Sequence, residues 1–119
     1  MDSDLTIADG PPVLEMPYPP ESDADQVSID NGEVKYHSYC FVCHGAGAVG
    51  GGVISDLRYM TAETHDKFSA IVLGGMYANK GMVGFSDILS QEDTEEIHAY
   101  LIQRAKETYY LERLNSFLK

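Results

Sequence analysis

The sequence predicts an all-α domain, and three observations support this. Apolar residues recur at three- and four-residue steps in three stretches, and glycine-rich segments separate those stretches. No stretch keeps the period-two alternation of a half-buried strand. With 119 residues, the chain has the length of one small domain. We therefore expect three main helices and long loops in a single folded unit.

Residues 1–26 are expected to lie outside that unit as an acidic, proline-rich linker or arm. This segment holds all five prolines of the chain and lacks Lys and Arg. Such a composition is typical of extended linkers. Leu14, Met16 and Tyr18 are mildly apolar, so docking of part of the arm remains open. The folded domain is predicted to span 27–119.

The first two helices are expected at about 27–43 and 62–73. Ile29, Gly32 and Tyr36 follow helical spacing in the first, and Gly74 with Gly75 would end the second. Between them, residues 45–52 read GAGAVGGG, which contains too much glycine for a helix or a strand. His65 falls in a polar first turn of the second helix, where we expect a surface position.

Residues 76–90 are predicted to form a loop, after which Ser90 resembles an N-cap with acidic residues in the following turn. The third helix would begin there, with Ile97 and Tyr100 on its apolar face. From about 106 it is expected to continue as a C-terminal extension carrying an apolar stripe that includes Leu114. That stripe could pack on its own domain, on a neighbouring domain or on a second copy of the chain.

The charge of the chain excludes several kinds of partner. The formal net charge is −11, whereas nucleic-acid and anionic-lipid surfaces attract basic proteins. No run approaches the roughly 18 apolar residues that a membrane-spanning helix needs. We therefore expect neither nucleic-acid binding nor membrane insertion.

The motif Cys40-Phe41-Val42-Cys43-His44 is the most informative feature of the sequence. Cys40 and Cys43 would lie one helical turn apart on the same face, as thioether bonds to the two vinyl groups of a haem require. His44 would point toward that face as the proximal iron ligand, and C-x-x-C-H is the signature of c-type haem attachment. A zinc site needs four ligands, and a redox C-x-x-C pair needs a βαβ context, so both are weaker alternatives.

The second axial position of the iron has several candidate ligands. Met82 is favoured because it lies between Gly81 and Gly84, with Phe85 beyond to cover the haem ring. Met76 is the next candidate, although methionine often fills gaps in a core. The remaining candidate ligands are Met60, His37, His65 and His98. The second axial position could also stay without a ligand.

The chain also resembles a known family. The runs CFVCHGAGAVGGGVISDLRYM, FSAIVLGGM and GMVGFSDILSQEDTEEIHAYLIQRA are similar to class I cytochrome c domains. More narrowly, the chain is similar to the C-terminal haem domain of quinohaemoprotein alcohol dehydrogenases, in which a proline-rich linker precedes that domain. The resemblance covers about 27–105 and implies haem c with Cys40, Cys43, His44 and Met82 at the iron site. It also implies that the first helix crosses the last at Gly32 and Tyr36.

One residue departs from the family pattern. The family usually has proline at the position of Ser55, whose carbonyl would accept the proximal imidazole N–H. Serine keeps that carbonyl but lacks the fixed φ of proline. Arg58 follows closely, and its guanidinium could pair with a haem propionate or simply face solvent.

These residues predict one-electron transfer by a His/Met-ligated haem c, with no enzymatic activity of the domain alone. The expected partner is a redox protein or a fused dehydrogenase domain, and self-association through the C-terminal helix is a further expectation. The alternatives are a cytochrome module of an extracellular protein acting in polysaccharide oxidation, or an open-site haem sensor or peroxidase. Covalent haem attachment predicts a bacterial periplasmic or extracellular location. Residues 1–4 do not resemble a signal peptide, so a native signal or upstream domain is expected to be absent from this chain.

Overall fold

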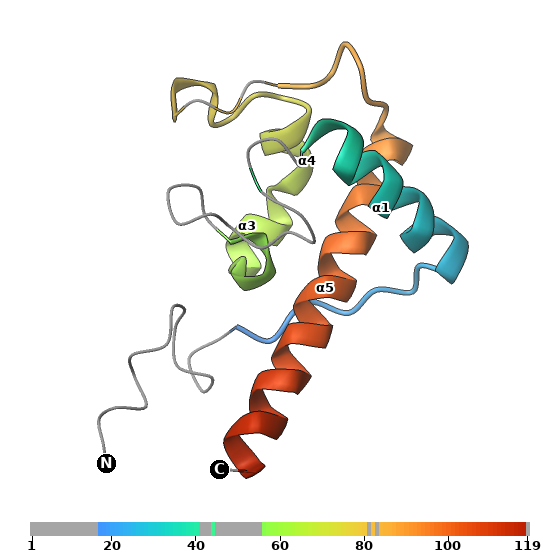
Figure 1. The fold of residues 1–119 in the computed structure, drawn as a ribbon. Helices are drawn as coiled ribbons and strands as arrows, with labels where there is room; N and C mark the ends of the chain where they lie inside the picture. The colour runs from blue at the N-terminus through green and yellow to red at the C-terminus, as the bar shows by residue number, and fades with distance from the viewer. Residues whose placement is uncertain (1–16, 41–43, 45–55, 81, 83, 119) are drawn as a thin grey trace.

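The computed structural model describes residues 17–40, 44, 56–80, 82 and 84–118, and these residues contain helices, turns and irregular segments but no strand. The long helix α5 (Gln91–Leu118) forms the axis of the molecule, and α1 (Gln26–Tyr39) crosses its first half (Figure 1). The all-α prediction is therefore confirmed. The short elements are α3 (Ala62–Asp66), α4 (Phe68–Val72) and two 3₁₀ turns, η4 (Leu57–Tyr59) and η5 (Ala78–Lys80).

Helix α1 begins one residue earlier than the sequence predicts and is described as far as Tyr39. Asp25 caps it, because its side chain accepts a hydrogen bond of 2.9 Å from the backbone N–H of Ser28. Beyond the helix, the N–H of Cys40 still donates to the carbonyl of Tyr36 at 2.7 Å. The predicted end at 43 lies outside the described residues.

The crossing of α1 and α5 is the tightest contact between helices in the described structure. A Cβ added to Gly32 would lie 1.8 Å from the backbone oxygen of Glu96, so only glycine fits at this point. The side chains of Tyr36 and Ile97 are fully buried beside it, and Tyr36 packs on Tyr100 with ring centroids 5.5 Å apart. The helix crossing expected at these residues is thus present.

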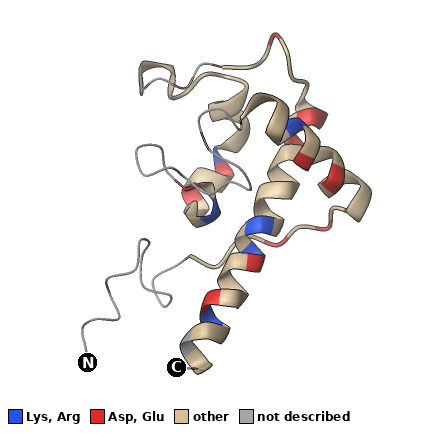
Figure 2. Ribbon diagram, in the orientation of Figure 1, with Lys and Arg blue, Asp and Glu red and all other residues tan. Residues whose placement is uncertain are grey.

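Polar contacts surround that crossing. Acidic residues gather on α1 and on the first turns of α5 (Figure 2). Lys35 lies among them, donating to Asp93 at 2.7 Å and also to Glu96. Hydrogen bonds from Lys35 and from Ser90 hold the pKa of Asp93 at about 2. The single cation of α1 therefore links the two helices where their carboxylates meet.

The second predicted helix consists of two short helices. Helix α3 ends at Asp66, and α4 begins at Phe68 after Lys67 departs from helical geometry. Phe68, Ile71 and Val72 are buried on one side of α4, as their spacing indicates. Gly75 follows with a φ of +69°, a left-handed conformation that glycine adopts without strain.

Helix α5 starts with the N-cap expected at Ser90. The Ser90 hydroxyl accepts from the Asp93 N–H at 3.0 Å, and the Asp93 carboxylate accepts from the Ser90 N–H at 2.9 Å. The helix then continues to Leu118. None of the helices in the described part of the chain is both long and apolar enough to cross a bilayer.

The last turns of α5 contact the arm but leave much apolar surface exposed. Tyr18 packs edge-on against Tyr109 at 5.1 Å between ring centroids, and its hydroxyl lies 3.0 Å from that of Tyr110. Pro19 is fully buried there, so this part of the arm docks on the domain. Residues 1–16 lie outside the described structure, and self-association through the tail stays a prediction. The exposed apolar side chains of the tail are Tyr110, Leu111, Leu114, Phe117 and Leu118.

Candidate cofactor site

The end of α1 brings two predicted haem-binding residues to adjacent turns of the chain. The N–H of His44 donates to the carbonyl of Cys40 at 3.0 Å, which is the i to i+4 bond of an α-helix. His44 therefore lies one helical turn beyond Cys40, and both residues are half-buried. This is the arrangement that the sequence predicts for a thioether cysteine and its proximal histidine. Cys43, the other predicted thioether residue, lies outside the described residues.

A set of half-buried apolar side chains packs against the buried core. Its members come from four separate segments, and each keeps part of its surface open to solvent. Cofactor sites are lined mostly by apolar side chains with a few ligating groups among them. The donor set and this apolar surface thus fit a flat apolar cofactor such as haem. The set consists of Ile29, Cys40, Leu57, Met60, Leu73, Met82 and Phe85.

Met82 belongs to this set and is held by the backbone around it. Its N–H donates to the carbonyl of Tyr77 at 3.2 Å, and the N–H of Phe85 donates to the carbonyl of Val72 at 2.7 Å. A Cβ added to Gly84 would lie 2.8 Å from the carbonyl oxygen of Leu73. Position 84 therefore requires a glycine, because this loop packs on the end of α4. The sequence interpretation missed this reason.

The other methionine candidates differ from Met82. Met76 is 46% exposed and lies outside the apolar set, whereas Met60 is half-buried within it next to η4. Phe85, expected to cover the haem ring, is half-buried and lies 6.4 Å from the ring of Tyr39 between centroids. Burial alone therefore favours Met82 and Met60 over Met76. The assignment of the distal ligand remains a prediction.

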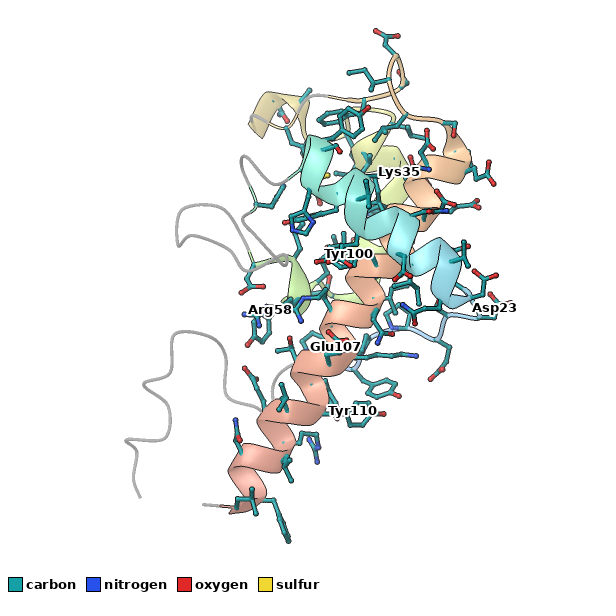
Figure 3. All side chains as sticks on the ribbon, turned by 45° about the vertical axis from the view of Figure 1, so that its right-hand side comes forward. Asp23, Lys35, Arg58, Tyr100, Glu107 and Tyr110 are labelled. Carbon is teal, nitrogen blue, oxygen red and sulfur yellow. The ribbon has the colours of Figure 1, made fainter. Side chains whose placement is uncertain are left out.

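Arg58 is engaged with protein groups on η4 and α5 (Figure 3). Its Nε and Nη2 atoms donate to the two carboxylate oxygens of Asp56 at 3.0 and 2.7 Å, and Nη1 donates to the Thr108 hydroxyl at 3.2 Å. Hydrogen bonding to Asp56 raises the pKa of Arg58. The solvent-facing alternative is wrong, because the Arg58 side chain is only 19% exposed. Its pairing with a propionate remains a prediction.

Tyr59 makes the next contact between η4 and α5. Its hydroxyl donates to a carboxylate oxygen of Glu112. Burial, followed by this hydrogen bond, raises the pKa of Tyr59 to about 12, so the hydroxyl stays protonated and donates. Ser55, whose carbonyl was expected to accept from the proximal imidazole, lies outside the described residues.

The structure also places two of the candidate histidines away from solvent. Only 6% of the His65 surface is exposed, so the surface position predicted for this residue is wrong. Its Nδ1 lies 2.8 Å from Nε2 of His98, and His98 stacks on Phe68 with ring centroids 4.2 Å apart. Burial lowers the pKa of both imidazoles, that of His98 to about 4. His98 is half-buried.

A signal for the position of His98 was present in the sequence. His98 follows Thr94 by four residues and precedes Leu101 by three, and both of these neighbours are buried on α5. The periodicity of α5 thus placed His98 at the border of the packed face. Among the described residues, no group of three His, Cys, Asp or Glu side chains has the arrangement of a metal site.

Comparison with known proteins identifies a family. The family model described as "Cytochrome C oxidase, cbb3-type, subunit III" matches residues 27–101. The chain is 42% identical over 98 residues to quinohemoprotein alcohol dehydrogenase ADH-IIG of Pseudomonas putida. It is 38% identical over 98 residues to the dehydrogenase subunit of alcohol dehydrogenase (quinone) of Acetobacter aceti, and both matches cover 82% of this chain.

A solved structure shows the same fold. The structure of quinohemoprotein alcohol dehydrogenase ADHIIG from Pseudomonas putida HK5 matches 81% of this chain with a TM-score of 0.76 and 42% identity. The chain spans only 14% of that protein's chain, and 14% and 13% of the two curated relatives above. It is therefore homologous to a small segment of much larger dehydrogenases.

Proposed function

The chain belongs to the cytochrome c family whose model describes subunit III of cbb3-type oxidases, and from that premise we propose that it transfers single electrons. Haem c is the cofactor that membership in this family implies. In the proposed site, Cys40 and Cys43 form the thioether bonds, and His44 and Met82 are the axial ligands. The homology to quinohemoprotein dehydrogenases supports a role as the electron carrier of such an enzyme.

The observation that supports this site most directly is the helical turn from Cys40 to His44. A thioether bond at Cys40 would bring the haem edge to the end of α1, and the 3.0 Å bond from the His44 N–H to the Cys40 carbonyl has the i to i+4 spacing of a helical turn. The half-buried apolar set includes both Cys40 and, from a different segment, Met82. In the proposed site, His44 and Met82 would bind the iron from opposite faces of the haem, with apolar side chains around it.

Haem c, when bound, supplies an iron centre that exchanges one electron between its ferrous and ferric states. The protein's own residues set the conditions for that exchange. Leu57, Leu73 and Phe85 would exclude water from the cofactor, and a thioether ligand with such burial favours the ferrous state. The contact of Gly84 with the end of α4 fixes the loop of Met82, so the ligand would stay in place in both states.

The proposed partner is the dehydrogenase part of the same enzyme, fused to this domain or separate from it. The curated relatives are named as dehydrogenases, and this chain corresponds to about one seventh of their length. Covalent haem is attached outside the cytoplasm in bacteria, so we propose a periplasmic location. The acidic surface of α1 and α5 would favour a contact with basic residues on a soluble acceptor.

Spectroscopic redox titration tests this function. The chain is produced with a c-type haem attachment system, extracted with acid–acetone, and titrated while the visible spectrum is recorded. We expect the haem to stay on the protein and a single titration step with the slope of a one-electron couple. Cys40→Ala with Cys43→Ala is the matched control and should release the haem. Extraction of haem from the wild-type chain, or a two-electron slope, would contradict the proposal.

The same preparation separates the proposal from the open-site alternative. A sensor or peroxidase keeps one axial position free, so cyanide or imidazole would bind at once to the wild-type haem. We expect no such binding at low ligand concentration, because Met82 fills that position. Rapid binding to the wild type would favour the sensor or peroxidase.

A further inference from the structure

The extension of α5 makes two side-chain contacts with the turn η4. The Thr108 hydroxyl accepts from Arg58 at 3.2 Å, and the Glu112 carboxylate accepts from Tyr59. Thr108 and Glu112 are four residues apart on α5, so they lie on one face of the helix. Thr108 is buried, with an exposed fraction of 5%. These contacts connect consecutive residues of η4 to consecutive turns of the helix.

The turn η4 adjoins the proposed haem surface. Leu57 and Met60, on either side of Arg58 and Tyr59, belong to the same half-buried apolar set as Cys40 and Met82. In a 3₁₀ turn, residues three apart lie on the same side. Leu57 and Met60 therefore share one side and pack on the core, while Arg58 and Tyr59 contact α5.

Arg58 retains donor capacity in this arrangement. A guanidinium has five N–H donors, and the contacts with Asp56 and Thr108 use one each from Nε, Nη1 and Nη2. The second N–H of each Nη atom remains to donate to a further carboxylate. Asp56 and Thr108 hold the plane of the guanidinium, so the direction of those two donors is fixed by the protein.

We infer that Thr108 and Glu112 are positioning residues for the proposed haem site. They hold η4 against α5, and through it they keep the Arg58 cation at the cofactor edge, where it faces the carboxylates of a bound haem. This inference rests on the proposed function. It gives the extension beyond residue 105 a role in setting the reduction potential of the domain.

The sign of a potential shift distinguishes positioning from simple charge. A cation near the iron disfavours the ferric state, which carries one more positive charge, so Arg58 raises the reduction potential. A variant in which Arg58 moves away from this position should therefore have a lower reduction potential. Removal of the Glu112 charge acts in the opposite direction, because an anion near the iron favours the ferric state. Thr108→Val changes no charge, so it reports on placement alone.

The experiment measures the midpoint potential of the holoprotein in four variants. Thr108→Val and Tyr59→Phe are the test changes: the first removes the hydroxyl that accepts from Arg58, the second removes the hydroxyl that donates to Glu112, and neither changes a charge. Arg58→Gln gives the effect of losing the cation entirely. Tyr110→Phe is the matched control, because it removes the same hydroxyl from an exposed position of α5. Far-UV circular dichroism confirms that each variant is folded, and either test variant alone suffices if the other fails to fold.

We expect Thr108→Val and Tyr59→Phe to lower the potential, in the same direction as Arg58→Gln but by a smaller amount, while Tyr110→Phe leaves it unchanged. A test variant that leaves the potential unchanged or raises it would overturn the inference. A wild-type chain without covalent haem would instead overturn the proposed function. The two failures are therefore distinguishable in one set of samples.

Discussion

Two parts of the core show different kinds of packing. Where α1 crosses α5, protein atoms fill the contact completely, and Tyr36 and Ile97 have no exposed surface. In the apolar set proposed to hold the haem, the residues from α1, η4 and the Met82 loop are only half-buried. The first contact is built around a glycine that admits no side chain, and the second is built around side chains that leave a surface open.

This difference indicates which part of the core the protein supplies by itself. A fully buried crossing contributes its hydrophobic free energy without any ligand. Half-buried side chains contribute their full hydrophobic free energy only when a flat apolar group covers them. A ligand that binds only the folded state also stabilises that state. We therefore regard α1 with α5 as the framework, and the haem as the remaining part of the core.

A substitution at Gly32 is expected to have the largest effect on the framework. In Gly32→Ala, the new Cβ would meet the Glu96 carbonyl at 1.8 Å, so the helices must separate. We expect a loss of about 3 kcal/mol in the free energy of unfolding, as for severe overpacking. Urea unfolding of the holoprotein measures it.

The matched control for that change lies on the same helix. Val34 is 67% exposed on α1, and Val34→Ala should change the free energy of unfolding by no more than about 0.5 kcal/mol. Equal, small effects at Gly32 and Val34 would show that the crossing is not the framework of the fold.

The histidine pair should make the framework sensitive to pH. The folded protein holds the pKa of His98 at about 4, whereas an unfolded chain titrates near 6.5. The unfolded state thus binds more protons between these values, and stability is lost as pH falls through that range. We expect about 2 kcal/mol of destabilisation between pH 7 and pH 5 from this group.

Denaturant unfolding at several pH values checks this, with His98→Gln as the comparison. The variant should show a smaller loss between pH 7 and pH 5. The Asp93 carboxylate, held at a pKa of about 2, contributes stability that disappears only below pH 4 or so, outside this window. An identical pH dependence in the variant and the wild type would rule out His98 as the cause.

Local patterns predicted most of the framework but not the contacts between distant side chains. The N-cap at Ser90 and the length of α5 follow from spacing and residue type within one segment, whereas the crossing at Gly32 was expected from the family resemblance. The buried state of His65 depends on His98, which is 33 residues away, and a polar first turn gave no sign of it.

The candidate site shows the same limit. The sequence selected Arg58 for its ability to bind a carboxylate, but its partners Asp56 and Thr108 depend on how η4 folds onto α5. Gly84 entered the sequence interpretation only as a neighbour of Met82, whereas the structure shows it packed on the backbone at the end of α4. The relation of Cys40 to His44 follows from their spacing alone, because four residues separate the two ends of a helical backbone bond.

The arm should contribute least, and its contribution should depend on where it is cut. Removal of residues 1–16 is expected to change the free energy of unfolding by less than about 1 kcal/mol. Removal of residues 1–22 also takes away Tyr18 and the fully buried Pro19, so we expect a loss of about 1 to 2 kcal/mol. Thermal unfolding of both truncated holoproteins measures the difference, and equal stabilities would mean that the docked part of the arm does not stabilise the domain.

The identity of the distal ligand is the most direct test of the proposed site. In the oxidised holoprotein, a methionine ligand produces a near-infrared sulfur-to-iron charge-transfer band. We expect Met82→Ala to abolish this band and to admit added imidazole, while Met76→Ala and Met60→Ala keep the band. Persistence of the band in Met82→Ala, or its loss in either of the other two variants alone, would contradict the account.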